Sequence, residues 1–284
     1  MPQTKHLRHL KPVNLEGGLI LRSAVTDDQV RSTVNLLGRI FGPTAGDLIR
    51  AMIDGYPGYR REGVYIVEDP SRDAEHRVVS TLALADRPWV FGGVVVPVAI
   101  LEAVATDPDY RERGLSATLY RVFETEARRA GYTVSAVSGI PRFYEKLGYT
   151  YAIPSGPSIS FATGELAKTL ESSRLKRVGD PGTGPGYRVR EVALADVPDI
   201  LDLYERRTQS LDIYGLCTRE AIQHQLRELT PVSRRSRYVV ERLGVGEPAV
   251  KASFSLLSSD AMASVADLVA SEYEAVLEAL RWAA

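Results

Sequence analysis

Residues 104–116 restrict the fold more than any other part of the sequence. A β-rich run ends at Thr106, Asp107 and Pro108 mark a turn, and a short loop containing Gly114 leads into a helical pattern. Such a loop leaves backbone N–H groups unpaired at the start of a helix, where the helix dipole adds partial positive charge. The segment therefore predicts an α/β domain with an anion site, suited to a pyrophosphate, between a strand and a helix.

The side chains of this loop fit the same prediction. Gly114 and Ser116 are small enough for phosphate oxygens to approach the backbone closely. Arg111 and Arg113 would add charge-assisted contacts to an anion. A basic surface loop that only caps a helix is the alternative, because short glycine motifs are common.

The chain on both sides of the loop predicts strands and helices in mixed order. Thr26 and Gln29 form a capping box at the start of the first helix. The buried face of this helix is expected to contain Val30, Val34, Leu37 and Phe41. Further helices are expected at residues 45–54, 116–130 and 141–147. Strands are expected at residues 19–25, 64–68, 77–85 and 132–137, with a long strand that ends at residue 106, a turn at 89–93 and two closing strands around 154–157.

A linker and a weak repeat divide the chain. Residues 178–186 read V-G-D-P-G-T-G-P-G, a composition typical of a linker. Beyond it, helices are expected near residues 196–209 and 218–229, and strands at 238–241, 250–257 and 264–270. Arg22 and Asp28 recur in spacing as Arg190 and Asp196, which suggests an internal duplication. The predicted parts are a flexible segment at 1–17, a domain at 18–165, a linker at 166–186 and a shortened domain at 187–284.

The second half copies the order of elements but not the loop. Its strand at 264–270 runs directly into a capping box that begins at Ser271, with Glu272 and Glu274 where a phosphate would have to lie. We expect no pyrophosphate there. The chain also stops after Trp282, which leaves three alternatives: a shortened domain, a partner chain or second copy that covers an open sheet edge, or a truncated chain.

Composition narrows the function classes. The net charge of −1 argues against binding to nucleic acid or to an anionic membrane. The single cysteine, Cys217, excludes an internal disulfide, and the four scattered histidines have no metal-ligand spacing, so no metal is expected. The most apolar run, residues 94–101, is too short to span a bilayer, and the basic start lacks a signal-peptide core. We therefore expect a cytoplasmic protein.

Two motifs resemble a known family. Arg111-x-x-Gly114-x-Ser116 resembles the Q/R-x-x-G-x-G/A signature of the GNAT (Gcn5-related N-acetyltransferase) superfamily, with Ser116 as a departure that is still small. About 30 residues later, residues 141–149 (P-R-F-Y-E-K-L-G-Y) resemble the Y-x-K-L-G-F/Y ending of that family. The resemblance covers about 150 residues. It implies a GNAT fold, in which helices flank a mixed central sheet, and acetyl-CoA as the cofactor.

The resemblance also implies roles for individual residues. The end of the fourth strand would pair with the pantetheine arm of CoA, and the loop and the first turn of the helix would bind its pyrophosphate. Tyr144 would protonate the departing thiolate, and Glu102, two residues before Val104 and so expected on the same strand face, is a candidate general base. An ion pair is the alternative for Glu102. The implied cofactor residues are Val104, Ala105, Thr106, Arg111, Glu112, Arg113, Gly114, Leu115, Ser116 and Ala117.

The leading hypothesis is an acetyl-CoA-dependent N-acetyltransferase that acts directly on a primary amine of a small molecule or peptide. A longer-acyl or aminoacyl transferase, a CoA-binding sensor without turnover, and an inert scaffold are the alternatives. An active unit followed by a degenerate one resembles the enhanced-intracellular-survival type acetyltransferases, which carry a further C-terminal domain. The sequence does not identify the acceptor.

Overall fold

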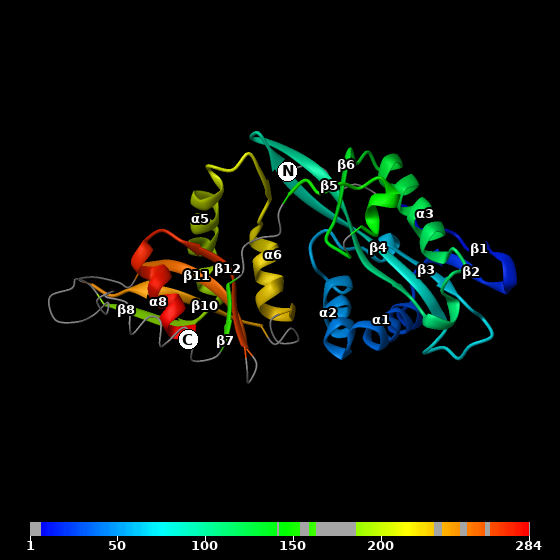
Figure 1. The fold of residues 1–284 in the computed structure, drawn as a ribbon, viewed down its shortest axis with the longest axis horizontal. Coiled ribbons are helices and arrows are strands. Elements are labelled where there is room, and N and C mark those ends of the chain that lie inside the picture. The colour runs from blue at the N-terminus through cyan, green and yellow to red at the C-terminus, as the bar shows by residue number, and fades with distance from the viewer. Residues whose placement is uncertain are drawn as a thin grey trace. The chain divides into compact units, whose positions relative to one another are not determined.

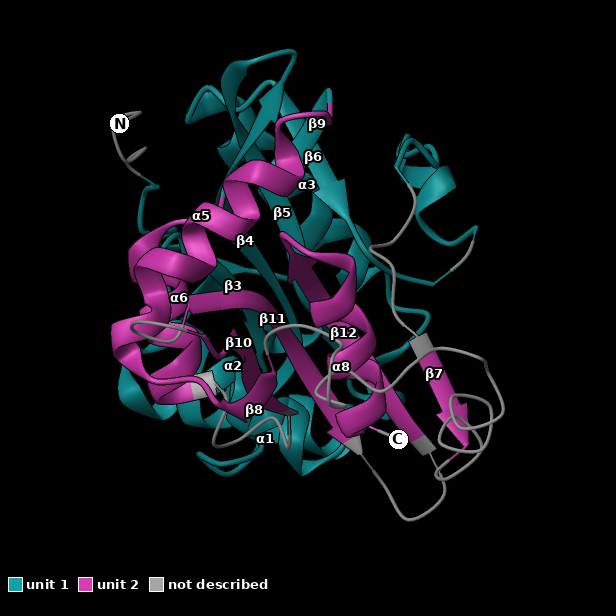
Figure 2. Cartoon of the chain, turned by 90° about the vertical axis from the view of Figure 1, so that its left-hand side faces the viewer, with its two compact units in different colours: residues 1–153, 212–216 teal, residues 154–211, 217–284 magenta. Residues whose placement is uncertain are grey.

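The computed structural model describes residues 7–140, 142–153, 159–162, 186–229, 235–244, 249–258 and 262–283. The chain forms two compact units, drawn in teal and magenta in Figure 2. The first comprises residues 1–153 and 212–216, and the second comprises 154–211 and 217–284. The expected linker at 166–186 lies outside the described residues, apart from Gly186.

A mixed sheet forms the centre of the first unit. Its described strands follow the order β1-β2-β3-β4-β5-β6, and β9 pairs with the far end of β4. Neighbours are antiparallel except for β5 and β6, which are parallel. The strands are β1 Val13–Asn14, β2 Ile20–Ser23, β3 Val64–Glu68, β4 Val78–Phe91, β5 Val94–Thr106, β6 Val134–Val137 and β9 Ile213–Gly215.

Helices cover both faces of this sheet (Figure 1). Helices α1 Asp27–Phe41 and α2 Pro43–Ile53 pack on one face, in a buried cluster that includes Leu37 and Ile100. Helix α3 Leu115–Arg129 packs on the other, in a cluster that includes Leu119 and Leu101. The expected strands and helices are thus largely confirmed, and helices on both faces of a mixed sheet are the arrangement of the GNAT fold.

Residues at helix ends and turns explain which of the expected boundaries are correct and which are wrong. The capping box of Thr26 and Gln29 is present at the start of α1. Phe41 was expected to be buried but is 59% exposed, at the residue where α1 ends and Gly42 turns the chain into α2. The expected turn at 89–93 is wrong: β4 continues to Phe91, because Gly92 and Gly93 alone, both with positive φ, make the hairpin.

A β-bulge changes the facing of residues near the end of β5. The register shifts from Thr81 opposite Ala105 to Ala83 opposite Glu102, and Ala103 adopts φ 52°. The expectation that Glu102 and Val104 share a face is therefore wrong. Val104 packs with the α3-side cluster, whereas Glu102 bonds to a tyrosine of the cluster on the α1 side.

Among the described residues, the strands expected on either side of 154–157 do not join the first sheet. Strand β7 Ile159–Ala162 pairs instead with β12 Met262–Ala270 of the second unit's sheet, and residues 149–153 form no strand. Pairing with β7 satisfies backbone groups of β12 that would otherwise lie at a sheet edge. In the described part of the first sheet, β6 has a partner on one side only.

The second unit repeats the predicted order of elements around the sheet β7-β12-β11-β10-β8. Its other strands are β8 Tyr187–Glu191, β10 Arg235–Arg242 and β11 Ala249–Ser258, and its helices are α5 Val197–Thr208, α6 Arg219–His224 and α8 Tyr273–Ala283. Figure 1 shows these elements in yellow-green to red. None of the helices in the described ranges is long and apolar enough to cross a membrane.

Equivalent features recur in the two units. Arg22 on β2 contacts Glu68 on β3 at 3.6 Å, and Arg190 on β8 pairs with Glu241 on β10 at 2.7 Å. The registers match, because Arg22 lies opposite Ile66 and Arg190 opposite Val239, two residues before each glutamate. The suggested aspartate equivalence is only partial: Arg190 also binds Asp196, whereas Asp28 pairs with Arg31.

Gly58, in the connection between α2 and β3, provides a test of the fold. A Cβ atom there would lie 1.9 Å from the carbonyl oxygen of Asp86, and its φ is +90°. We expect Gly58→Ala to lower the free energy of unfolding by about 3 kcal/mol or more. Gly38→Ala is the matched control, because a Cβ there meets nothing within 4 Å, and it should stabilise α1 by up to about 1 kcal/mol. Equal urea midpoints for the two variants would contradict this packing.

Candidate active site

The loop after β5 places a row of backbone donors at the start of α3. A single 3-10 turn, Pro108–Tyr110, follows the strand, and Glu112 and Gly114 then adopt φ 63° and 73°. Thr118 donates the first helical hydrogen bond, to Gly114 at 3.0 Å. Among the described residues, none accepts a hydrogen bond from the N–H groups of residues 112–117. The predicted geometry for an anion, free amides at a helix start, is therefore present.

Asp107 holds the start of this loop. Its buried carboxylate accepts hydrogen bonds from Arg39 at 3.0 Å and Arg72 at 2.9 Å, and from the N–H of Asp109 at 3.2 Å. Burial by itself would raise the pKa of Asp107, but the Arg72 and Asp109 hydrogen bonds and the two arginine charges outweigh it and lower the pKa below 3.8. The carboxylate is therefore ionised at neutral pH and fixes the turn to two other segments.

A chain of hydroxyl groups joins the strand end to the helix. Ser80 contacts Thr106 at 2.8 Å, and Thr106 contacts Ser116 at 3.0 Å, between their hydroxyl oxygens. The Ser116 side chain is thus held against the end of β5. The serine that departs from the family signature has a structural partner here, which the sequence did not reveal.

A cavity of about 320 Å³ lies beside these amides and extends along β5. Eight of the ten expected cofactor residues line it: Val104, Thr106, Arg111, Glu112, Gly114, Leu115, Ser116 and Ala117. Ala105 does not, because it is buried with the opposite cluster. Arg113 does not either, because its guanidinium lies over the Tyr110 ring at 4.6 Å. The remaining lining residues, not singled out from the sequence for this cavity, are Leu82, Leu101, Tyr110, Tyr120, Phe143, Lys146 and Leu147, together with Tyr144.

Tyr144 begins the 3-10 helix Tyr144–Leu147 beside this cavity. The Tyr120 hydroxyl donates a hydrogen bond to the carbonyl of Leu147 at 2.9 Å and so fastens this turn to α3. The Tyr144 ring leaves no room for a side chain at Gly139, where a Cβ would lie 2.3 Å from it. Burial raises the pKa of Tyr144, so its phenol is protonated at neutral pH. Within the described residues its hydroxyl has no hydrogen-bond partner.

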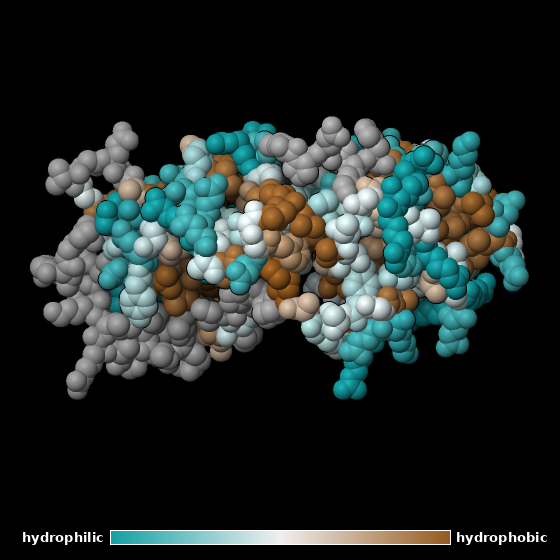
Figure 3. All heavy atoms as spheres, turned by 90° about the horizontal axis from the view of Figure 1, so that it is seen from above, coloured by the Kyte–Doolittle hydropathy of each residue, from teal (hydrophilic) through white to brown (hydrophobic). Residues whose placement is uncertain are grey.

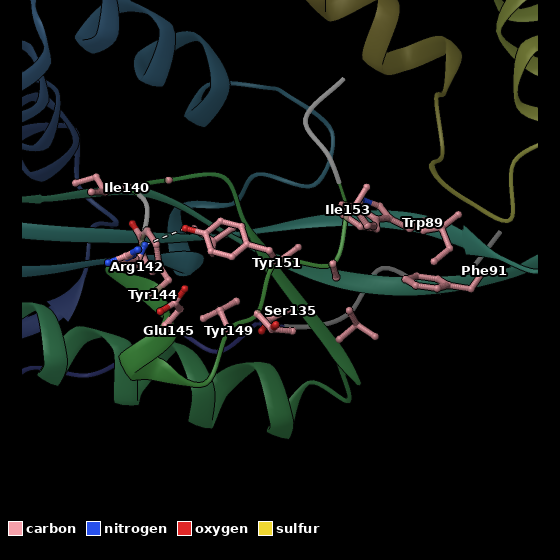
Figure 4. A pocket seen from close by; sticks show the side chains of 17 residues that line it. Trp89, Phe91, Ser135, Ile140, Arg142, Tyr144, Glu145, Tyr149, Tyr151 and Ile153 are labelled. Carbon is pink, nitrogen blue, oxygen red and sulfur yellow. Dashed lines mark hydrogen bonds between the residues drawn. The ribbon is translucent and has the colours of Figure 1, made fainter. Parts of the chain in front are cut away.

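A second cavity of about 270 Å³ shares Tyr144 with the first (Figure 4). It is formed by β6, residues 139–140, 142 and 144–145, residues 149–153, the end of the β4 hairpin and Ile213. The backbone N–H of Arg142 donates a hydrogen bond to the Tyr151 hydroxyl at 2.9 Å, which joins two of these segments. Sequence patterns did not indicate this cavity, because its walls come from segments far apart in the chain.

Glu102 lines neither cavity. Its carboxylate accepts a hydrogen bond from the Tyr59 hydroxyl at 2.9 Å and pairs with Arg87 at 3.0 Å. Burial, and then the Glu102 charge, raise the pKa of Tyr59 well above 10. Arg87 also lies over the Tyr56 ring, at 5.1 Å from its centre. The carboxylate is thus ion-paired, as one of the two sequence alternatives for it expects.

Comparison with known proteins agrees with this geometry. Residues 22–152 match the family model described as acetyltransferase (GNAT) domain. No curated protein matches the sequence. A GCN5-related N-acetyltransferase from Kribbella flavida aligns over 93% of this chain and 60% of its own, with TM-score 0.61 and 20% identity. A GCN5-related N-acetyltransferase from Anabaena variabilis aligns over 93% of this chain and 62% of its own, with TM-score 0.62 and 20% identity.

A third similar structure is Saccharomyces cerevisiae N-myristoyltransferase with bound myristoyl-CoA. It aligns over 93% of this chain and 64% of its own, with TM-score 0.61 and 13% identity. The chain therefore spans less than two thirds of the length of these relatives. At these identities the likeness to the solved structures shows a shared fold and no more. The match to the GNAT acetyltransferase domain is confined to residues 22–152.

The ion pairs of Asp107 predict a pH-dependent contribution to stability. Because the folded-state pKa lies below 3.8, this contribution is complete above about pH 4 and is lost as the pH falls through the folded value. We expect Asp107→Asn to lower the free energy of unfolding by about 2 kcal/mol at pH 7 and by less at about pH 3, in urea titrations. Asp28→Asn removes an exposed ion pair with Arg31 and should lower the free energy of unfolding by under about 1 kcal/mol at both pH values. If the effect of Asp107→Asn on the free energy of unfolding grows as the pH falls, the lowered pKa of Asp107 is contradicted.

Proposed function

From the GNAT domain of residues 22–152, we propose that the chain is an N-acyltransferase that moves an acyl group from CoA directly to a primary amine, with acetyl-CoA as the donor. The observation that carries the proposal is the row of N–H groups at residues 112–117, which have no acceptor among the described residues and lie beside a cavity lined by the protonated phenol of Tyr144. Diphosphate, thioester and proton donor would then lie along one path.

The cofactor fits the residues present. The amides and the start of α3 would bind the pyrophosphate, with Arg111 at the cavity wall as a charge-assisted partner. Strands β5 and β6 are paired only over residues 98–101 and 134–137. Beyond Leu101 no described residue pairs with the edge of β5 that faces β6, so Val104 and its neighbours can pair with the amides of pantetheine.

Tyr144 is proposed as the general acid. In direct transfer the amine nitrogen bonds to the thioester carbonyl carbon, the C–S bond breaks, and the thiolate must gain a proton while the amine loses one. A phenol with a raised pKa and no competing partner among the described residues can supply the first proton. Glu102 stays a candidate base acting through water, although its ion pair with Arg87 restricts it.

The second unit is proposed as a degenerate duplicate that binds no CoA. Residues 107–114 separate β5 from α3, whereas only residues 271–272 separate β12 from α8. The carboxylate of Glu272 lies at that helix start and bonds to Tyr187 and Arg242, both at 2.7 Å. No loop is left to hold a phosphate. The matching bulges at Ala103 and Asp267, with φ 52° and 53°, support a common origin of the units.

A longer acyl group is the second candidate. The solved N-myristoyltransferase with bound myristoyl-CoA shares the fold, so the fold does not restrict the donor to acetyl. A CoA sensor without turnover is distinguished by a thiol-release assay, in which only an enzyme consumes the thioester.

Calorimetric titration with CoA tests the cofactor site. We expect one CoA per chain, and Arg111→Ala to weaken binding about tenfold through loss of a charge-assisted contact. Arg113→Ala is the matched control, because Arg113 packs on Tyr110 and does not line the cavity, so its effect should be smaller. Two CoA per chain would refute the degenerate second unit, and no binding would refute the proposed function.

The acid role of Tyr144 makes a separate prediction. Tyr144→Phe should lower kcat about tenfold or more and leave CoA affinity within about twofold, because only the proton is removed. Tyr110→Phe is the control, since Tyr110 lines the same cavity but its hydroxyl donates to Asp69. An unchanged kcat for Tyr144→Phe would remove it from the mechanism. Glu102→Gln in the same assay should alter the pH–rate profile if Glu102 is the base.

A further inference from the structure

The second cavity is lined mainly by aromatic and aliphatic side chains, and we call it the aromatic cavity (residues 89, 91, 134–137, 139–140, 142, 144–145, 149–153 and 213). Several of the large apolar side chains that this chain exposes gather around it: Tyr151 is 71% exposed, Ile140 69%, Ile153 45% and Ile213 39%. Brown patches in Figure 3 show that apolar groups reach the surface elsewhere too. In the aromatic cavity they surround a hollow that has Tyr144 in its wall. Such a concentration indicates a binding site.

We propose that the aromatic cavity holds the non-reacting body of the amine acceptor, so that the preferred acceptors are primary amines on an aromatic or branched aliphatic group. This inference rests on the proposed function and deepens it. Tyr144 lines both cavities, so an amine seated in the aromatic cavity would face the thioester across the phenol that protonates the thiolate.

The separation of the two cavities favours an acceptor over an acyl chain. An acyl chain is covalently attached to CoA and would continue the cavity that holds the cofactor, whose inner end is lined by Leu82 and Leu101. The aromatic cavity is distinct from it and shares only Tyr144. A second substrate that enters independently needs a separate cavity of this kind.

The charges of the wall fit the chemistry of the reaction. The amine must be neutral to attack, and an apolar surrounding disfavours the ammonium form. Among the described residues of the wall, Arg142 and Glu145 are the ones with side chains of a charged type, and both are exposed. Arg142 would disfavour an ammonium group nearby and Glu145 would favour one, so these two charges oppose each other and the apolar part of the wall decides. The cavity would therefore favour the neutral, nucleophilic form of an amine with an apolar body. A polar polyamine would not gain from this effect.

The test compares phenethylamine with ethanolamine as acceptors in a thiol-release assay with acetyl-CoA. Both are primary amines, and they differ in the apolar body. For the wild-type chain we expect kcat/KM for phenethylamine to be at least about tenfold higher. Ala152→Trp, which fills the cavity from its rim, should remove this preference and leave the CoA dissociation constant unchanged. Ala195→Trp, at an exposed site in the second unit, is the matched control.

Ile153→Asp is a second variant, which introduces a charge instead of bulk and should remove the preference in the same way. Equal kcat/KM for the two amines in the wild type, or a preference that survives both variants with CoA binding intact, would overturn the inference and leave the proposed function standing. Loss of octanoyl-CoA affinity but not acetyl-CoA affinity in Ala152→Trp would overturn it in favour of an acyl chain. No CoA binding in the wild type would overturn both.

Discussion

Strands β5 and β6 are hydrogen-bonded over only four residues, 98–101 against 134–137, and the site depends on where that pairing stops. Beyond it, β5 keeps its bonds to β4, and within the described ranges nothing pairs with its edge toward β6. The chain after β6 leads away to the turn that carries Tyr144. Because parallel strands that part in this way leave both backbones unsatisfied on facing edges, the gap can accept a ligand with amides of its own. The remaining features fix the two sides of this gap.

Non-glycine residues with positive φ lie on both sides of this gap, at Arg142 after β6 and at two positions on the β5 side. Ala103 and Glu112 have positive φ values although neither is glycine, and such conformations persist only where their surroundings enforce them. The enforcement is visible for the loop: Asp107 is bound by Arg39 and Arg72, and Ser116 is tied to Thr106. The loop is thus rigid before any ligand arrives, and donors that need no reorganisation bind an anion at lower entropic cost.

What could be predicted from the sequence was local. The capping box of Thr26 and Gln29 and the loop around Gly114 each consist of neighbouring residues whose chemistry determines one arrangement. The errors involve long-range pairing. The facing of Glu102 depends on a bulge set by register with β4, and β7 pairs with β12 about a hundred residues away. The aromatic cavity was missed for the same reason, because no local pattern joins β4, β6 and Ile213.

The second unit shows which parts of this arrangement can occur without the others. It has a bulged strand of its own, with Asp267 in positive φ as Ala103 is in the first unit, and an arginine–glutamate pair between its first strands. It has no comparable loop between strand and helix, and the Glu272 carboxylate at the start of α8 accepts hydrogen bonds from Tyr187 and Arg242. A bulged strand next to a helix is therefore insufficient to leave free amides. The length of the loop between strand and helix decides whether the helix start faces a ligand or one of the chain's own carboxylates.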